Sequence, residues 1–184
     1  MTSRNKSGSM IGGGVCNEVV EYIEEWVPGD HDSESGFRDE LQEYLDVRLN
    51  EYNSTDVHVG LGGGSGEQYP IRVEHGKSRA DVAVGDAVGI ELKYNLDNNR
   101  VYELKGQIDT YKKEYPCVIA VACGLSDKGR WRELQNEYDG VGTIGMQMNE
   151  SEVHFVHKKE ENFGKDPSDV RDNSGGFMGG GGLF

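Results

Sequence analysis

The sequence predicts an α/β fold in which helices cover one mixed β-sheet. Apolar residues in the first third of the chain recur at helical spacing, whereas from residue 71 onward they alternate with polar residues or run together as in strands. A strand, a helix and a fully apolar strand follow one another over residues 88–123, which is typical of a right-handed βαβ unit. The 184 residues suit one domain with a single sizeable core.

Composition divides the chain into three parts. Residues 1–14 are rich in Ser and Gly and are expected to be disordered, residues 15–159 to form the domain, and residues 160–184 to form a disordered tail. Phe177 and Phe184 stand in a Gly-rich context near the end of that tail. The tail is expected to be disordered without a binding function, and the alternative is that these side chains dock on a protein partner.

Two helices are expected at the start of the domain. Apolar residues from Val15 to Val27 follow helical spacing until Pro28-Gly29 stops the run. A second helix, from Phe37 to Tyr52, is predicted by one apolar stripe, with Ser33 or Ser35 available as its cap.

A β-hairpin is expected over residues 81–93, because apolar and polar residues alternate on both sides of a turn signal at Gly85-Asp86. With a three-residue connection, Asp81 faces Glu91 across the hairpin, and Lys93 joins the same polar side by period two. A two-residue turn would break up this polar patch, so the patch depends on the register.

The remaining elements are expected from similar patterns. The run Cys117–Cys123 is apolar throughout, so it is predicted to be a central strand covered on both faces. The others are strands at 55–59 and 71–74, a glycine-rich loop at 61–68, helices at 100–115 and 126–138, and edge strands at 141–148 and 153–156.

The charge balance restricts the classes of partner. Thirty-three acidic residues stand against 19 basic ones, a net charge of -14, which argues against an ordinary basic surface for nucleic acid. A nucleic-acid enzyme is not excluded, because most of the excess negative charge lies in residues 17–56. Such acidity is also typical of proteins that work in concentrated salt. We therefore expect a halophilic host, an archaeon or its virus, with an ordinary cytoplasm as the alternative.

The cysteines and histidines give no spacing that supports zinc. Cys16, Cys117 and Cys123 form no CxxC pair, and the latter two flank the apolar run, so they are interpreted as small buried hydrophobic residues in a reducing compartment. The longest apolar run is too short to cross a bilayer, and Gly12-Gly13-Gly14 stand where a signal peptide would need an apolar core. A cytoplasmic protein without a membrane partner is expected.

One set of polar residues recurs in an order that carries chemistry. Asp81 is followed by Glu91-Leu92-Lys93 and then, on the next helix, by Gln107 and Tyr111. This order resembles the PD-(D/E)xK nuclease superfamily, and the last two residues resemble the QxxxY motif of its RecB-type branch. The resemblance covers about residues 37–123 and implies a restriction-endonuclease-like α-β-β-β-α-β core.

The resemblance also implies a metal site. Asp81 and Glu91 would bind Mg²⁺, with Mn²⁺ as the alternative ion, and the Leu92 carbonyl would be a third ligand. Lys93 would position and polarise the attacking water. Ala80 departs from the pattern, since the superfamily has Pro at that position.

Helical residues would complete the site. Gln107 and Tyr111 are four apart and share one helix face, from which they would line the site. Glu40 would be the additional acidic residue of the first core helix. Four basic residues on the later helix would contact the phosphate backbone of the substrate: Arg100, Lys105, Lys112 and Lys113.

These residue types suit phosphodiester hydrolysis. Mg²⁺ takes oxygen ligands and needs only one or two carboxylates, and it supplies both a nucleophile at neutral pH and charge stabilisation. Asp81 and Glu91 would repel each other without a cation, and Lys93 offsets part of that repulsion. The expected function is therefore a metal-dependent nuclease that acts on DNA.

Two other functions stay open. A non-catalytic interaction or regulatory protein that keeps the nuclease fold is favoured by the net charge, because an acidic protein binds DNA poorly at ordinary ionic strength. A structural protein without a metal is the other hypothesis, since Glu-x-Lys on a strand is usually an ion pair on a solvated face. DNA or RNA preference, endo- or exonuclease action and oligomeric state are left open.

Overall fold

The structure is a computed structural model that describes residues 11–51, 68–139 and 151–172. Its centre is a five-stranded sheet with the strand order β1-β2-β3-β4-β5. The first three strands pair antiparallel, and β3, β4 and β5 pair parallel, so the sheet is mixed, as predicted. The strands are β1 (Ile71–His75), β2 (Ala80–Val84), β3 (Val88–Leu96), β4 (Cys117–Leu125) and β5 (Glu152–Lys158).

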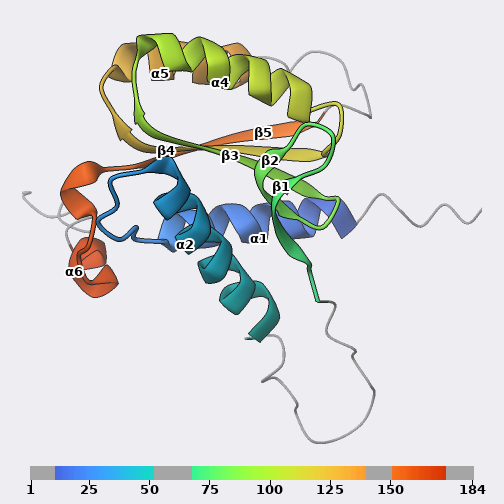
Figure 1. Ribbon diagram of the computed structural model, residues 1–184, viewed down its shortest axis with the longest axis horizontal. Helices are drawn as coiled ribbons and strands as arrows, with labels where there is room; N and C mark the ends of the chain where they lie inside the picture. Colours follow the sequence, from blue (N-terminus) through green and yellow to red (C-terminus); the bar gives the residue numbers. More distant parts are fainter. Residues whose placement is uncertain (1–10, 52–67, 140–150, 173–184) are drawn as a thin grey trace, which may run out of the picture.

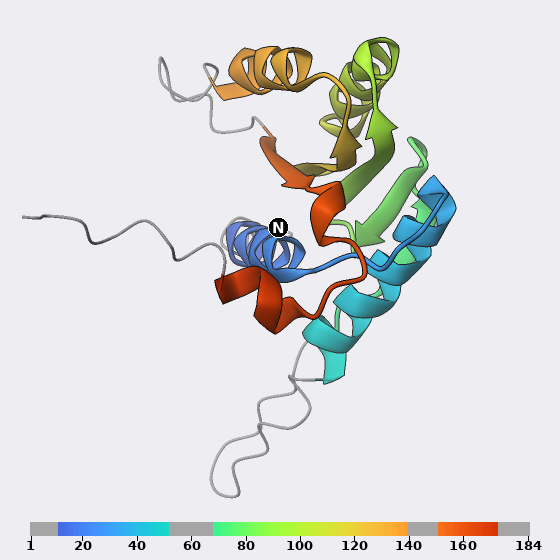
Figure 2. The ribbon, with the colours of Figure 1, turned by 90° about the vertical axis from the view of Figure 1, so that its left-hand side faces the viewer.

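Helices cover both faces of the sheet, which gives three layers (Figures 1 and 2). Helices α4 and α5 lie on one face, and α1 and α2 lie on the other. The helices are α1 (Ile11–Glu25), α2 (Glu34–Asp46), α4 (Asn98–Tyr111), α5 (Lys128–Asp139) and α6 (Pro167–Asp172), with short turns η1 (Val47–Glu51) and η2 (Glu160–Asn162).

Two apolar cores result, one on each side of the sheet. Ile23 of α1 and Leu41 of α2 pack with Ile90 and Val121 on one face, whereas Leu104 and Ile108 of α4 pack with Val118 on the other. The whole run from Cys117 to Cys123 is buried. The predicted central strand is therefore confirmed.

The predicted hairpin is confirmed with its predicted register. Val84 pairs with Val88 and Val82 with Ile90. A three-residue turn joins the two strands, and its positive φ of 54° falls on Gly85, which has no Cβ to clash. Because the register holds, the polar residues of both strands lie on the face that α4 covers.

The chain is structured beyond the expected domain limits. Helix α1 begins at Ile11, within the segment expected to be disordered, and η2 and α6 lie within the expected tail. The Phe163 ring packs 5.1 Å from the Phe37 ring, which also lies 5.1 Å from Tyr94, and Gly164 N–H donates to the Pro28 carbonyl at 2.8 Å. One apolar side chain in a polar stretch thus anchors the C-terminal segment.

Some expected elements fall outside the described residues. These are the strands expected at 55–59 and 141–148 and nearly all of the loop expected at 61–68. Helix α4 begins two residues earlier and ends four residues earlier than expected, because its Asp97 cap fixes the start and backbone turns replace helix after Tyr111.

The interpretation of the cysteines needs a correction. Cys16 of α1 and Cys117 of β4 form a disulfide with a Cα–Cα distance of 6.0 Å, because α1 lies against the start of that strand. Cys123 is buried and unpaired, as expected. The prediction of a reducing compartment was based on Cys117 and Cys123, and the disulfide contradicts it at Cys117, which is buried as predicted but paired.

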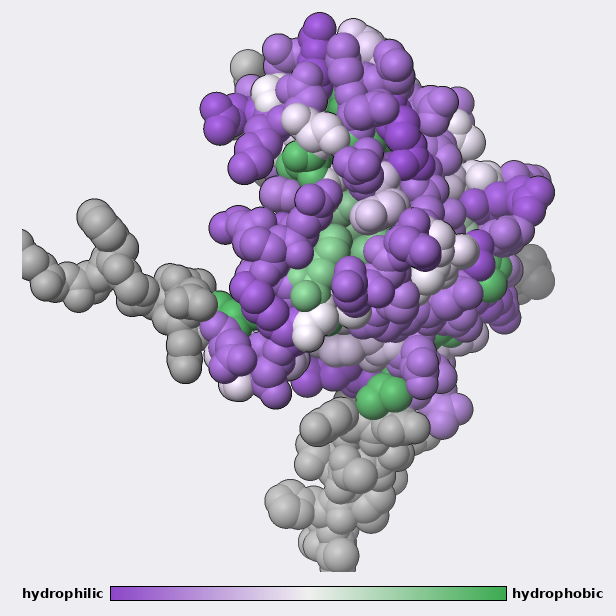
Figure 3. Space-filling model, turned by 60° about the vertical axis from the view of Figure 1, so that its left-hand side comes forward, coloured by the Kyte–Doolittle hydropathy of each residue, from purple (hydrophilic) through white to green (hydrophobic). Residues whose placement is uncertain are grey.

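The surface is largely polar on the side drawn in Figure 3. The face seen in Figure 3 is mostly hydrophilic, with small hydrophobic areas between the polar side chains. Within the described residues, none of the helices combines the length and apolar character needed to cross a bilayer.

Candidate functional site

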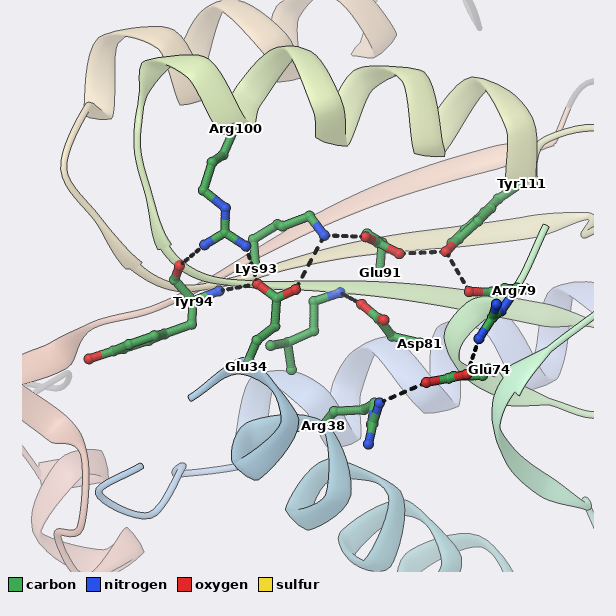
Figure 4. A network of polar contacts seen from close by, with 11 residues as sticks. Glu34, Arg38, Glu74, Arg79, Asp81, Glu91, Lys93, Tyr94, Arg100 and Tyr111 are labelled. Carbon is green, nitrogen blue, oxygen red and sulfur yellow. Dashed lines mark hydrogen bonds and ion pairs between the residues drawn. The ribbon is translucent and has the colours of Figure 1, made fainter. Parts of the chain in front are cut away.

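A group of polar side chains gathers around the middle of β3, where β2, α2 and α4 approach it (Figure 4). We call this group the polar cluster. Strand β3 contributes an acid and a base two residues apart, and the neighbouring elements contribute the others. Its members are Glu34, Asp81, Glu91, Lys93, Arg100 and Tyr111.

Asp81 enters the polar cluster where β2 parts from β3. The regular pairing of the two strands ends at Val82, and the Asp81 side chain takes the next N–H of β3, since Oδ2 accepts from Leu92 N at 2.9 Å. Burial raises the pKa of Asp81, and the Leu92 N–H offsets part of that rise. The Asp81 carboxylate therefore belongs to the polar cluster and also satisfies the Leu92 N–H, which lies beyond the last residue pair of the two strands.

Glu91 is the buried centre of the polar cluster. Its exposed fraction is 0%. One of its oxygens accepts from Lys93 Nζ, and the other lies 2.5 Å from Tyr111 OH. Burial, followed by the charge of Asp81, raises the pKa of Glu91 to about 7. This carboxyl consequently exchanges a proton near neutral pH, which is typical of functional sites and of structural ion pairs alike.

The Tyr111 hydroxyl shows how that proton can be shared. It lies 2.5 Å from Glu91 Oε2 and 3.1 Å from the Arg79 carbonyl oxygen, yet a hydroxyl has only one proton to donate. Both contacts are satisfied when the Glu91 carboxyl is protonated and donates to Tyr111, which in turn donates to Arg79. Arg79 itself has a φ of 58°, a conformation unusual for a residue with a Cβ.

Lys93 and Arg100 balance the acids. Lys93 is 5% exposed, and its Nζ also lies 3.4 Å from Glu34 Oε1. Burial opposes the charged form of Lys93, but Glu91 and the neighbouring carboxylates outweigh it, so the pKa is raised. Arg100 donates to the other oxygen of Glu34 and, at 2.5 Å, to the Tyr94 carbonyl. Lys93 therefore stays protonated.

Glu34 is a member of the polar cluster that the sequence did not single out. It is the first residue of α2, directly after Ser33, whose hydroxyl accepts from Gly36 N at 3.3 Å and caps the helix as predicted. Its Oε2 accepts from Tyr94 N at 3.2 Å. The sequence offered one indication of this residue, an acid directly after a capping serine. Acids are favoured in the first turn of a helix, so this position marks Glu34 as a residue at the start of α2.

Glu40 is not brought into the polar cluster. Its Oε1 accepts from Trp26 Nε1 at 3.0 Å, and its Oε2 lies 2.9 Å from Gly29 N and 2.5 Å from His31 Nε2. The side chain thus holds the connection between α1 and α2 in place. A structural role accounts for all of these contacts.

Gln107 has an unsatisfied polar atom. Its Oε1 is buried and has no hydrogen-bond partner among the described residues. Gln107 lies one turn before Tyr111 and two turns after Arg100, so the three side chains share one face of α4. A buried carbonyl oxygen without a donor costs about 1–3 kcal/mol, so a missing ligand, ion or water is expected beside it.

Two other basic residues, Lys105 within α4 and Lys112 at its C-cap, contact residues outside the polar cluster. Lys105 pairs with Glu137 of α5, and Lys112 Nζ lies 5.4 Å from the centre of the Tyr138 ring. Both side chains are therefore directed toward α5. Among the basic residues proposed to contact phosphate, Arg100 is the one that the structure brings to the polar cluster.

The polar cluster contains side chains of the types that bind small divalent cations. Asp81 and Glu91 offer carboxylate oxygens, the ligands that Mg²⁺ and Mn²⁺ prefer. Burial raises the pKa of both groups, so their ionised forms are disfavoured, and a bound cation would offset that penalty. Gln107 shares the face of α4 that carries Tyr111 and Arg100, and its buried oxygen is a ligand of the same chemical class.

Comparisons with known proteins add no identification. No protein-family model matches the chain, and neither a curated protein nor a solved structure matches it. A function for this chain is therefore inferred from the polar cluster and the fold around it.

Proposed function

We propose that the protein is a divalent-metal-dependent nuclease of the PD-(D/E)xK type that acts on DNA. The observation that supports this most is the meeting of Asp81 with Glu91 and Lys93 beneath the helix that carries Gln107 and Tyr111. The element order α2, β1, β2, β3, α4, β4 is compatible with an α-β-β-β-α-β core.

In this proposal Asp81 and Glu91 hold the ion, with the Leu92 carbonyl as the third ligand. The bound ion would supply a Lewis acid and a water nucleophile at neutral pH. Lys93 keeps a proton at Nζ, so its ammonium orients the attacking water and balances charge on the phosphate. Tyr111 fixes the orientation of the Glu91 carboxyl through its 2.5 Å hydrogen bond.

One observation favours the non-catalytic alternative. Glu91 and Lys93 are almost fully buried and already satisfy each other, which is also what a structural ion pair does. Asp81 distinguishes the two proposals, because a purely structural pair does not need a second, partly buried carboxylate beside it. Titration with metal ions separates them directly.

Metal binding and cleavage are to be measured on the full-length chain. We expect calorimetric titration with Mg²⁺ and Mn²⁺ to show binding that Asp81→Asn and Glu91→Gln remove. Cleavage of single- and double-stranded DNA, assayed across KCl concentrations, is expected to fall at least about 100-fold in both variants and in Lys93→Met. Glu137→Gln, an equivalent change at an exposed ion pair on α5, is the control and should keep both activities.

Gln107→Met tests whether the helix belongs to the site. Without metal, the free energy of unfolding of this variant is expected to equal that of the wild type or to exceed it by up to about 1 kcal/mol. The reason is that the substitution removes a buried oxygen that accepts no hydrogen bond. In the presence of Mn²⁺ the variant is expected to bind the ion more weakly than the wild type. Wild-type levels of DNA cleavage and metal binding in the Asp81 and Glu91 variants would exclude the nuclease.

A further inference from the structure

We propose that Cys16, Cys117 and His154, once the disulfide is reduced, form a binding site for a thiophilic divalent ion such as Zn²⁺. The two sulfurs and one imidazole nitrogen all lie within 4.8 Å of one another. They come from α1, from the first residue of β4 and from β5. Two thiolates and a histidine are a ligand set that zinc prefers.

The histidine supplies the second, independent observation. His154 Nε2 is buried and has no hydrogen-bond partner among the described residues. The carboxylate of Glu152 lies 3.6 Å from this nitrogen, and the two form an ion pair only when the ring is protonated. A metal ion bound by the two sulfurs and the His154 ring would give this histidine the partner that it lacks, and Glu152 would add negative charge and a fourth ligand.

The site is separate from the polar cluster. In the pairing of β4 with β5, Cys117 lies opposite Glu152 and Ile119 opposite His154, so these side chains share one face of the sheet. Cys117 and Ile119 belong to the core beneath α1 and α2, whereas Tyr111 belongs to the core on the other face. Binding at the sulfurs therefore does not depend on the proposed nuclease site.

Disulfide and metal are alternative states of the same two sulfurs. A dithiol or phosphine reductant donates two electrons to the disulfide, which takes up two protons and becomes two thiols. Binding of the ion then releases both thiol protons. With Zn–S bonds of about 2.3 Å, tetrahedral ligands lie roughly 3.8 Å apart, so the sulfurs must separate by side-chain rotation while the Cα atoms stay near their present 6.0 Å.

The test uses Co²⁺ and Zn²⁺ with the full chain. The protein, reduced with a phosphine and kept anaerobic, is expected to develop a thiolate-to-cobalt charge-transfer band on addition of Co²⁺, and Zn²⁺ should displace the cobalt at one ion per chain. The oxidised protein should give no band. Co²⁺ at the polar cluster does not produce this band, because that cluster contains no thiolate.

Variants assign the ligands. Cys117→Ser and His154→Ala are expected to weaken Zn²⁺ binding at least about 100-fold, since losing a ligand costs more than the roughly 10–100-fold typical of an outer partner. Cys123→Ala is the control, because Cys123 lies six residues along β4, roughly 20 Å away. His154→Ala leaves the cysteine pair intact, so it stays informative even if Cys117→Ser fails to fold. A reduced protein without the band, or a band that survives in His154→Ala at full affinity, would overturn the proposal.

Discussion

At the residue scale, the proton on Glu91 is the most informative feature of the molecule. The carboxyl is buried between a cation and a phenol, and burial raises its pKa from an ordinary 4.5 to about 7. The folded chain therefore binds this proton more tightly than the unfolded chain does. Stability from this group is complete below about pH 4.5 and is lost as the pH rises through 7.

Glu91→Gln is predicted to flatten this pH dependence. In the wild type, the free energy of unfolding should decline between pH 4.5 and 7 by an amount on the order of 3 kcal/mol from this group. The variant has no proton to lose at that position, so its decline should be smaller by about that amount. Urea unfolding followed by tryptophan fluorescence at steps across this range measures the difference.

The control for this prediction is Glu137→Gln, which changes the same functional group at an exposed position. It should keep the wild-type decline. Equal declines in Glu91→Gln and wild type would mean that Glu91 is already ionised throughout the range. Saturating Mg²⁺ should also reduce the wild-type decline if the ion binds this carboxylate, because bound charge favours the ionised form.

At the scale of elements, helix α2 contributes different acids to two different tasks. Glu34, in its first turn, reaches Lys93 and Arg100, whereas Glu40, nearly two turns later, binds the connection between α1 and α2. Glu40 is therefore predicted to matter for stability and not for metal binding. The close contact of Glu40 with the connection also requires glycine at position 29, since a Cβ there would lie 2.9 Å from Glu40 Oε2.

Glu40→Ala should lower the free energy of unfolding by roughly 2–4 kcal/mol, because buried Trp26 and the Gly29 N–H lose a charged acceptor. Mn²⁺ affinity should stay at the wild-type value. Glu43→Ala, at an exposed position of the same helix, should change stability by about 0.5 kcal/mol or less. Denaturant unfolding and calorimetry give the two readouts, and loss of Mn²⁺ binding in Glu40→Ala would contradict the assignment.

The difference between the two glutamates shows what sequence patterns can establish. Period-two alternation was enough to predict the hairpin and its register, because a slip of one residue would turn every apolar side chain outward. Helical spacing places Glu40 beside an apolar stripe, but it does not say which end of the helix meets β3. The contact of Glu34 with Lys93 spans 59 residues, and only the packed structure specifies it.

Long-range pairing limited the prediction in the same way elsewhere. Cys16 and Cys117 are 101 residues apart, so no short spacing rule connects them with each other or with His154. Gln107 and Tyr111, by contrast, were assigned to one helix face from a spacing of four residues, and the helix is present as expected. Local periodicity was therefore a better guide than residue type alone.

At the scale of the whole molecule, the net charge of -14 should make the fold depend on salt. Like charges repel in the compact state, and the Debye length falls from roughly 30 Å at 0.01 M salt to roughly 3 Å at 1 M. We predict that Tm rises with KCl across this range, by about 2–4 °C for each kcal/mol of repulsion that is screened. Thermal unfolding by circular dichroism measures it, and a Tm that is constant or falls would contradict the prediction.

The contact between Phe163 and Phe37 has a consequence for any shortened version of the protein. Phe37 lies between Phe163 and Tyr94, and the backbone of Tyr94 binds both Glu34 and Arg100. A chain trimmed at residue 159, where its composition turns polar, would keep all strands of the described residues but would lose the Phe163 ring that packs against Phe37. Without Phe163, the packing of Phe37 and then of Tyr94 would change, and with it the position of the Glu34–Arg100 pair. A resulting loss of activity could be mistaken for the absence of a catalytic residue.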